Sequence, residues 1–166
     1  MTRTVRDLGP LAIGVALFGV LIAVLLNGGH VVGSWLFAAF LLGHGWVHTM
    51  YVMPQPKVSA AGAKGAQWPF ELDHSPILSA IGLTPGGQRT LGSLLVAATV
   101  AGYSVAAMAT IPLILPASSW PALVVASSVV SLALIGVFFH RNLLVGVAID
   151  VVLLAVCFSS VWLPAV

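Results

Sequence analysis

Long apolar runs, separated by short polar connections, make up most of the chain. Each run approaches the ~20 residues that a helix needs to cross the hydrocarbon core of a bilayer. The runs lack the strict apolar and polar alternation of a transmembrane β-barrel and are blocks of Leu, Val, Ala and Ile rich in Gly. The pattern therefore predicts an all-α, polytopic membrane protein with five transmembrane helices, at residues 11–26, 34–53, 90–115, 122–139 and 143–163.

The longest connection, residues 54–89, changes character halfway. Its first half, PQPKVSAAGAKGAQ, has no periodicity and is typical of a linker. Its second half begins with the aromatic triplet WPF, continues with Ser75 followed by Pro76 as a helix start, and ends with Gly86 and Gly87 as a helix stop. We therefore expect a short interfacial helix in this connection, and one transmembrane domain over residues 1–166.

Composition supports the membrane interpretation, since 60% of the 166 residues are hydrophobic and only 6% are charged. With five spans, all six basic residues fall on one side of the membrane: Arg3, Arg6, Lys57, Lys64, Arg89 and Arg141. The positive-inside rule then predicts a protein of the inner cell membrane with a cytoplasmic N-terminus and an external C-terminus. We expect the lipid bilayer as its partner, together with other membrane subunits or a second copy, and no nucleic acid.

The first apolar run also has the length of a signal-peptide core. The stretch that follows it, NGGHVVG, lacks a small-x-small cleavage site, so we expect the run to be retained. The single cysteine, Cys157, has no partner for an internal disulfide and is interpreted as a small apolar filler.

Two histidines interrupt the second apolar run, in the stretch LLGHGWVHTMYVMP. His44 and His48 are four residues apart, which places them on one helical face, and Tyr51 continues the same stripe. With a rise of ~1.5 Å per residue, His48 lies ~8 Å and His44 ~14 Å from the cytoplasmic end of the helix. Asp150, in the fifth run, lies at a similar depth of ~12 Å.

An ionisable group in hydrocarbon costs from ~2.5 to more than 10 kcal/mol, so Asp150 needs a partner. The two histidines are the titratable groups at its depth, and the pattern predicts that they contact it. Ser127 and Ser131 add a polar stripe to the fourth run. Small residues that would let these helices approach closely are Gly43, Gly45 and Gly146.

Three functions fit this cluster. In the first, His44, His48, Asp150 and Tyr51 bind a proton or a small ligand in a transport or accessory protein. In the second, His44 and His48 ligate a metal or haem, or the cluster binds a quinone, in an intramembrane enzyme or redox subunit. In the third, the cluster only fixes helix packing. The sequence leaves open whether the protein is an enzyme.

The motif Gly-His-Gly-x2-His at residues 43–48, together with WPF at residues 68–70, resembles small multispanning bacterial membrane proteins of unknown function. The resemblance covers about a third of the chain and implies only a bacterial membrane protein, because architecture by itself does not specify an activity.

Overall fold

The computed structural model describes residues 30–53, 70–111 and 115–159. These residues form helices and connections without strands, so the predicted all-α class is confirmed for the described part of the chain. The elements, in chain order, are α2 (His30–Val47), η1 (His48–Tyr51), α3 (Pro76–Ala80), α4 (Pro85–Thr110), η2 (Ala117–Ser119), α5 (Trp120–Val137), η3 (Arg141–Leu143) and α6 (Leu144–Phe158), where η marks a 3-10 helix.

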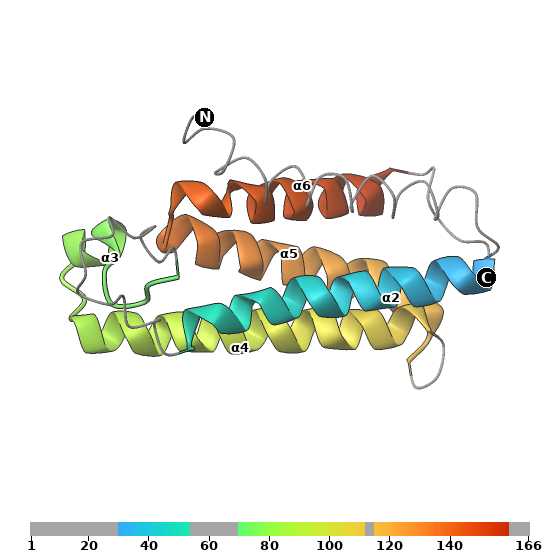
Figure 1. The fold of residues 1–166 in the computed structure, drawn as a ribbon, viewed down its shortest axis with the longest axis horizontal. Coiled ribbons are helices and arrows are strands. Elements are labelled where there is room, and N and C mark those ends of the chain that lie inside the picture. Colours follow the sequence, from blue (N-terminus) through green and yellow to red (C-terminus); the bar gives the residue numbers. More distant parts are fainter. Residues whose placement is uncertain (1–29, 54–69, 112–114, 160–166) are drawn as a thin grey trace, which may run out of the picture.

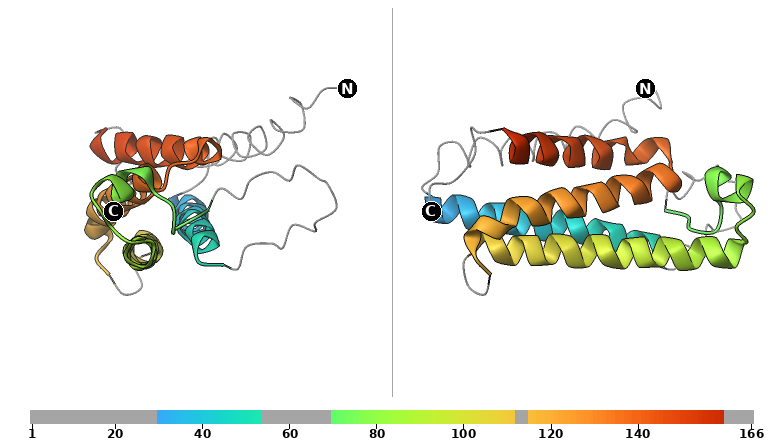
Figure 2. Two further views of the ribbon diagram at one scale, coloured as in Figure 1. Left: turned by 90° about the vertical axis from the view of Figure 1, so that its left-hand side faces the viewer. Right: turned by 180° about the vertical axis from the view of Figure 1, so that it is seen from behind.

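The four long helices form one bundle, with the short helix α3 at one end (Figure 1). Helix α4 packs against α2 and α5, and α5 packs against α6. Figure 2 shows α4 end-on and α6 from the side in the same view, so α6 is inclined to α4. Helix α5 lies centrally, because it contacts both α4 and α6.

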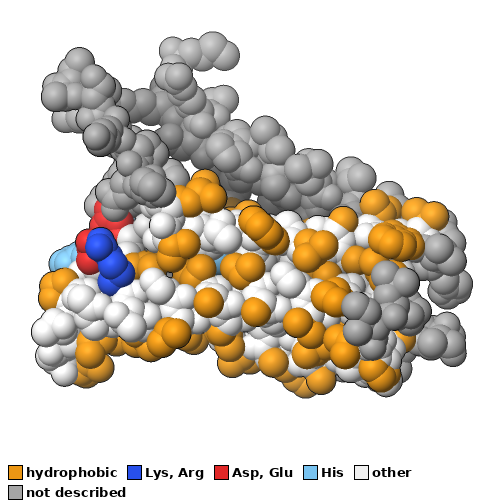
Figure 3. Space-filling view, turned by 90° about the horizontal axis from the view of Figure 1, so that it is seen from below, with side chains coloured by type: hydrophobic (Ala, Val, Ile, Leu, Met, Phe, Trp, Pro, Cys, Tyr) orange, Lys and Arg blue, Asp and Glu red, His pale blue; other side chains and the backbone are white. Residues whose placement is uncertain are grey.

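Three of the described helical segments are long and apolar enough to cross a membrane: Pro85–Thr110, Ala117–Val137 and Arg141–Phe158. Many of their large apolar side chains point outward, as expected for helices surrounded by lipid rather than water. Apolar side chains are spread along the length of the molecule in Figure 3, whereas the charged ones gather at one end.

The predicted number of five spans is not confirmed. The first predicted span, residues 11–26, lies outside the described residues. The second, residues 34–53, corresponds to α2 and η1, which are not among the three segments that meet the length and hydropathy of a membrane span. The last, residues 143–163, corresponds to η3 and α6 as far as residue 159.

The connection before α4 differs in part from the prediction. Helix α3 begins as expected, since the Ser75 hydroxyl caps it by accepting a hydrogen bond from the Leu78 N–H at 3.3 Å. It ends at Ala80, however, and the chain turns at Gly82, whose φ is 81°. The predicted stop at Gly86 and Gly87 is wrong, because both residues lie in the first turn of α4.

Helix α4 begins at Pro85 rather than at residue 90 because a stronger start signal precedes the two glycines. The Thr84 hydroxyl accepts a hydrogen bond from the Gly87 N–H at 3.3 Å, and Pro85 occupies the first helical position.

The Ser75 hydroxyl also donates to the Val137 carbonyl at 2.6 Å. This bond ties α3 to the end of α5.

Two apolar clusters fill the bundle, one toward each end. The cluster remote from α3 includes Leu41 of α2, Val124 of α5 and Leu153 of α6. The cluster near α3 includes Tyr51 of η1 and Leu134 of α5. In α2, α5 and α6, the buried polar residues come between members of the two clusters in the sequence. A polar layer therefore lies between two apolar layers.

Candidate functional site

The carboxylate of Asp150 lies at the centre of this polar layer and is completely buried. Its Oδ1 accepts hydrogen bonds from His44 Nε2 at 2.8 Å and from the Tyr103 hydroxyl at 2.5 Å. Its Oδ2 accepts a hydrogen bond from the Ser131 hydroxyl at 2.6 Å. These donors come from α2, α4 and α5, so one side chain of α6 joins all four long helices.

His48 reaches this carboxylate only through Ser131. Its Nδ1 lies 3.0 Å from the His44 carbonyl oxygen, and its Nε2 lies 2.9 Å from Ser131 Oγ. A carbonyl oxygen only accepts hydrogen bonds, so Nδ1 must carry a proton. This fixed Nδ1–H determines the tautomer of the ring whenever His48 is neutral.

Tyr103 and Ser128 complete the layer. The Tyr103 hydroxyl has one proton, which it donates to Asp150, so the Ser128 hydroxyl donates to the Tyr103 oxygen at 2.9 Å. The ring of Tyr103 also contacts the His44 ring nearly edge-on, with centroids 4.9 Å apart. Tyr103 therefore contacts both His44 and Asp150.

The structure brings His44, His48 and Asp150 together with Ser131 and separates Tyr51 from them. The Tyr51 ring lies in the apolar cluster near α3, where it meets Phe70 edge-on at a centroid distance of 5.0 Å. Tyr51 keeps the face of His48, because residues three apart share a face in the 3-10 helix His48–Tyr51, and the separation is along the helix axis. A 3-10 helix rises ~2 Å per residue, which carries Tyr51 ~6 Å beyond His48 toward the end of the bundle.

Sequence reasoning missed Tyr103 and Ser128. The signal for Tyr103 was its position in the middle of an apolar run, since tyrosines of membrane proteins favour the two interfaces. A buried tyrosine needs a partner for its hydroxyl, as Asp150 does for its carboxylate. No comparable signal distinguished Ser128 from its neighbour Ser127, whose hydroxyl bonds the Leu123 carbonyl of its own helix at 2.7 Å.

Only one of the three predicted glycines provides a close backbone approach within this site. A Cβ on Gly45 would lie 2.8 Å from Tyr103 Cβ, so α2 and α4 approach each other there because residue 45 has no side chain. A Cβ on Gly146 would meet only the flexible end of Ile135 at 3.1 Å. A Cβ on Gly43 would have no described atom within 4 Å, so Gly43 provides no close approach among the described helices.

The two histidines are directed toward protein partners in this arrangement. Within the described ranges, no group of three or more His, Cys, Asp or Glu residues is placed to hold a metal ion. The interpretation of His44 and His48 as metal or haem ligands stays a prediction, which elemental analysis and absorbance of the purified protein would test. Cys157 is partly buried and packs against the apolar cluster remote from α3.

Comparison of the chain with models of known protein families, with curated proteins and with solved structures found no match. The geometry of the polar layer therefore provides the functional evidence for this membrane-type helical bundle.

The two tyrosines of the chain allow a matched test of the layer. Tyr103→Phe removes a donor to Asp150 and leaves Ser128 without its partner, so we expect the free energy of unfolding to fall by about 1.5 kcal/mol. Tyr51→Phe removes a buried hydroxyl that has no hydrogen-bond partner among the described residues, so we expect no loss and a gain of up to about 1 kcal/mol. Denaturant unfolding in detergent micelles would measure both. Equal losses would contradict the assigned hydrogen bonds.

Proposed function

We propose that this chain is a five-span protein of a bacterial inner membrane in which the polar layer transfers protons between His48 and Asp150. The proposal places the N-terminus in the cytoplasm and the C-terminus outside, because all six basic residues then face the cytoplasm. The apolar outer surfaces of the described helices support the membrane assignment. The hydrogen bonds of Ser131 support the proton transfer.

The observation that carries the proposal is that the Ser131 hydroxyl, which has a single proton, lies between two hydrogen-bonding groups. Its hydroxyl lies 2.9 Å from His48 Nε2 and 2.6 Å from Asp150 Oδ2. It donates to one of them and must accept a hydrogen bond from the other. Because His48 Nδ1–H is already directed at a carbonyl, only two arrangements of the protons satisfy every bond.

In the first arrangement Asp150 is ionised and His48 carries two protons. His48 Nε2–H donates to Ser131, and Ser131 donates to Asp150 Oδ2. In the second arrangement Asp150 carries a proton on Oδ2 and donates it to Ser131, while Ser131 donates to a neutral His48. The number of protons is the same in both arrangements.

The second arrangement converts into the first when two protons move along existing hydrogen bonds. The proton on Asp150 Oδ2 passes to Ser131 Oγ, and the Ser131 proton passes to His48 Nε2. Two O–H bonds break, and one O–H bond and one N–H bond form, without any displacement of the heavy atoms. A row of hydrogen bonds with two proton arrangements is a minimal proton relay.

Two opposing contributions keep the free energies of the two proton arrangements similar. Burial in a low-dielectric interior disfavours the charged pair, because both groups lose their hydration. The three hydrogen bonds donated to the Asp150 carboxylate favour its ionised form. A relay needs this balance, since a strongly preferred arrangement would hold the proton at one end.

Proton flux into proteoliposomes tests the proposal. The full chain is reconstituted with a pH-sensitive dye inside, and a potassium diffusion potential drives protons inward. We expect Ser131→Ala to lower the flux by ~10-fold or more, because it removes the group that passes the proton. Ser127→Ala is the matched control, since that hydroxyl lies one turn away and bonds only its own helix.

Two outcomes would contradict the relay. A wild-type protein that passes no protons under either polarity of the potential would reject proton transfer across the membrane. A Ser131→Ala variant that conducts like the wild type would show that protons do not pass through Ser131. A loss of stability in Ser131→Ala without any flux in the wild type would instead indicate that the layer only fixes helix packing.

A further inference from the structure

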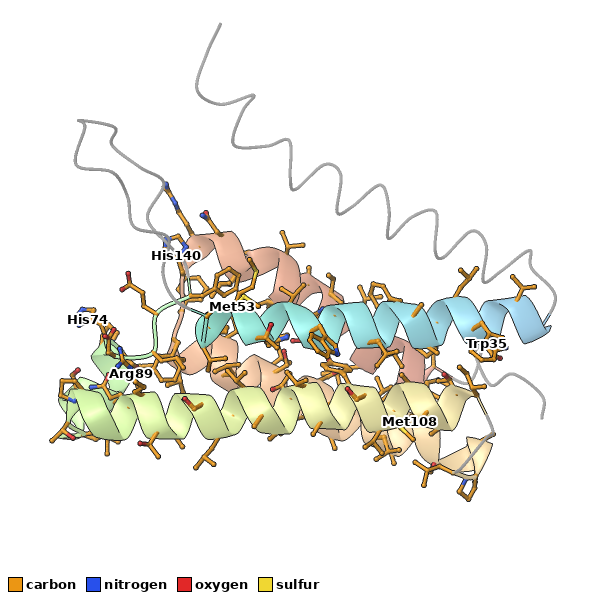
Figure 4. The ribbon with its side chains drawn as sticks, turned by 60° about the horizontal axis from the view of Figure 1, so that its bottom comes forward. Trp35, Met53, His74, Arg89, Met108 and His140 are labelled. Carbon is orange, nitrogen blue, oxygen red and sulfur yellow. The ribbon has the colours of Figure 1, made fainter. Side chains whose placement is uncertain are left out.

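A second polar feature lies at the end of the bundle near α3, apart from the buried layer. A pocket of about 460 Å³ is bounded by η1, by the residues that precede α3, and by α4. Its volume falls in the range of small-molecule sites. Met53, His74 and Arg89 mark this end of the bundle in Figure 4, and Trp35 and Met108 mark the opposite end. The charged side chains seen at one end of Figure 3 lie here.

Among the described residues that line the pocket, carboxylates outnumber cations by one. Arg89 Nη2 lies 3.1 Å from Asp73 Oδ2, so these two side chains neutralise each other. Glu71 also lines the pocket and forms no ion pair with any residue of the described ranges. The described residues of the lining therefore carry a net charge of −1, which favours a cationic ligand.

Two aromatic rings form the adjoining part of the wall. Tyr51 and Phe70 line the pocket and meet edge-on, with an interplanar angle of 86°. The face of such a ring attracts a positive charge, most strongly when the charge is partly desolvated. Tyr51 is 5% exposed, and its buried hydroxyl has no hydrogen-bond partner among the described residues, so a bound group would satisfy a polar atom that the described fold leaves unpaired.

The ligand chemistry follows from the number of free oxygen ligands. Calcium takes six to eight oxygen ligands, and Mg²⁺ is usually held by one or two carboxylates together with a substrate phosphate, whereas the described lining offers Glu71 as its carboxylate outside an ion pair. A protonated amine needs only a carboxylate for its N–H groups and an aromatic face for its charge. The rim also includes Val52 and Met53, which are half-exposed and apolar, so it suits a ligand with an apolar portion.

We propose that this pocket binds a protonated primary amine, with the ammonium group between the Glu71 carboxylate and the rings of Tyr51 and Phe70. The amine has two sources, a soluble organic amine or the ethanolamine headgroup of a phospholipid. The proposal uses none of the relay residues. Ser131→Ala should therefore bind the amine as the wild type does, whatever its proton flux.

Binding is tested on the detergent-purified full chain with two probes. Phenethylammonium chloride represents a soluble amine, and its uncharged analogue phenylethanol is the control. Isothermal calorimetry measures these two, and native mass spectrometry compares phosphatidylethanolamine with phosphatidylglycerol. We expect the wild type to bind phenethylammonium and not phenylethanol, or to retain phosphatidylethanolamine in preference to phosphatidylglycerol.

Two charge variants give opposite expected results. Glu71→Gln removes the unpaired carboxylate, so we expect the dissociation constant to rise about threefold or more. Arg89→Gln leaves Asp73 unpaired and makes the pocket more negative, so we expect the dissociation constant to fall. Both side chains are at least partly exposed, and neither change should prevent folding.

The outcome for the two probes distinguishes the sources. Binding of phenethylammonium alone would assign the pocket to a soluble amine, and retention of phosphatidylethanolamine alone would assign it to a lipid headgroup. Absence of both, or binding that is unchanged in Glu71→Gln and Arg89→Gln, would overturn the proposal. Because the relay is measured separately through Ser131→Ala, failure of either proposal leaves the other one standing.

Discussion

Replacing Asp150 with Leu is expected to lower the free energy of unfolding by about 3 to 5 kcal/mol, because three buried donors lose their common acceptor. These donors are His44 Nε2, the Tyr103 hydroxyl and the Ser131 hydroxyl. Leu has the same branched arrangement of side-chain atoms and leaves no cavity, so the loss reflects the unsatisfied polar groups together with overpacking by its larger methyl groups. Denaturant unfolding in mixed micelles, followed by circular dichroism, measures it.

Asp150→Asn provides the matched control and separates stability from function. The Asn oxygen can accept from His44 and Tyr103, while its N–H donates to Ser131, whose own proton then goes to His48 Nε2. This pattern reproduces the arrangement in which Asp150 is protonated, so we expect a loss of no more than about 1 kcal/mol. The amide does not release its proton, so the proton flux should be abolished.

A different result for Asn would change the interpretation. If Asp150→Asn destabilises the protein as strongly as Asp150→Leu, the site needs a charged carboxylate, and the protonated arrangement of the relay is not accessible. If Asp150→Asn still conducts protons, the path does not pass through residue 150.

The same variants test which histidine is the direct partner of Asp150. His44→Ala and Asp150→Leu should be non-additive by about 1 kcal/mol or more, since the two side chains are in contact. The coupling of His48→Ala with Asp150→Leu should be smaller, because Ser131 lies between them. The reverse order would contradict the hydrogen bonds found here.

Adding one methyl group at position 45 is expected to lower the free energy of unfolding by about 2 to 3 kcal/mol. The new Cβ in Gly45→Ala would lie 2.8 Å from Tyr103 Cβ, an atom that cannot rotate away from it. Helices α2 and α4 must then separate, as in other overpacked cores. The shift also displaces the Tyr103 hydroxyl from Asp150, so proton flux should fall with stability.

Gly43→Ala makes the same change two residues away, where a Cβ would have no described atom within 4 Å. We expect its free energy of unfolding to stay within about 1 kcal/mol of the wild type, with a gain from the better helix propensity of Ala. Similar losses in the two variants would show that the close approach at Gly45 is not a feature of the folded protein.

The sequence by itself determined the features that depend on neighbouring residues. Apolar runs without alternation specified helices, and Ser75 followed by Pro76 specified the start of α3. The same local signal is present at Thr84 and Pro85, where it outweighs the stop that Gly86 and Gly87 indicate. The cap has priority because it satisfies N–H groups that the first turn leaves without partners.

The sequence also placed His44, His48 and Asp150 at one depth, because depth follows from counting residues along a helix of known rise. The cost of an isolated charge in hydrocarbon then required a partner for Asp150. Depth and the need for a partner do not depend on how the helices are rotated. They identify which groups are available for contact, but not which of them touch.

Only the tertiary structure decided the contacts themselves. Whether Asp150 meets His44 directly, reaches His48 through Ser131, or also binds Tyr103 depends on the rotation of each helix about its axis and on the approach at Gly45. Tyr51 lies on the stripe of the histidines, but the 3-10 rise from His48 carries it beyond the polar layer, toward the end of the bundle. Periodicity fixes the face of one helix, whereas a site made by four helices depends on how their faces pack together.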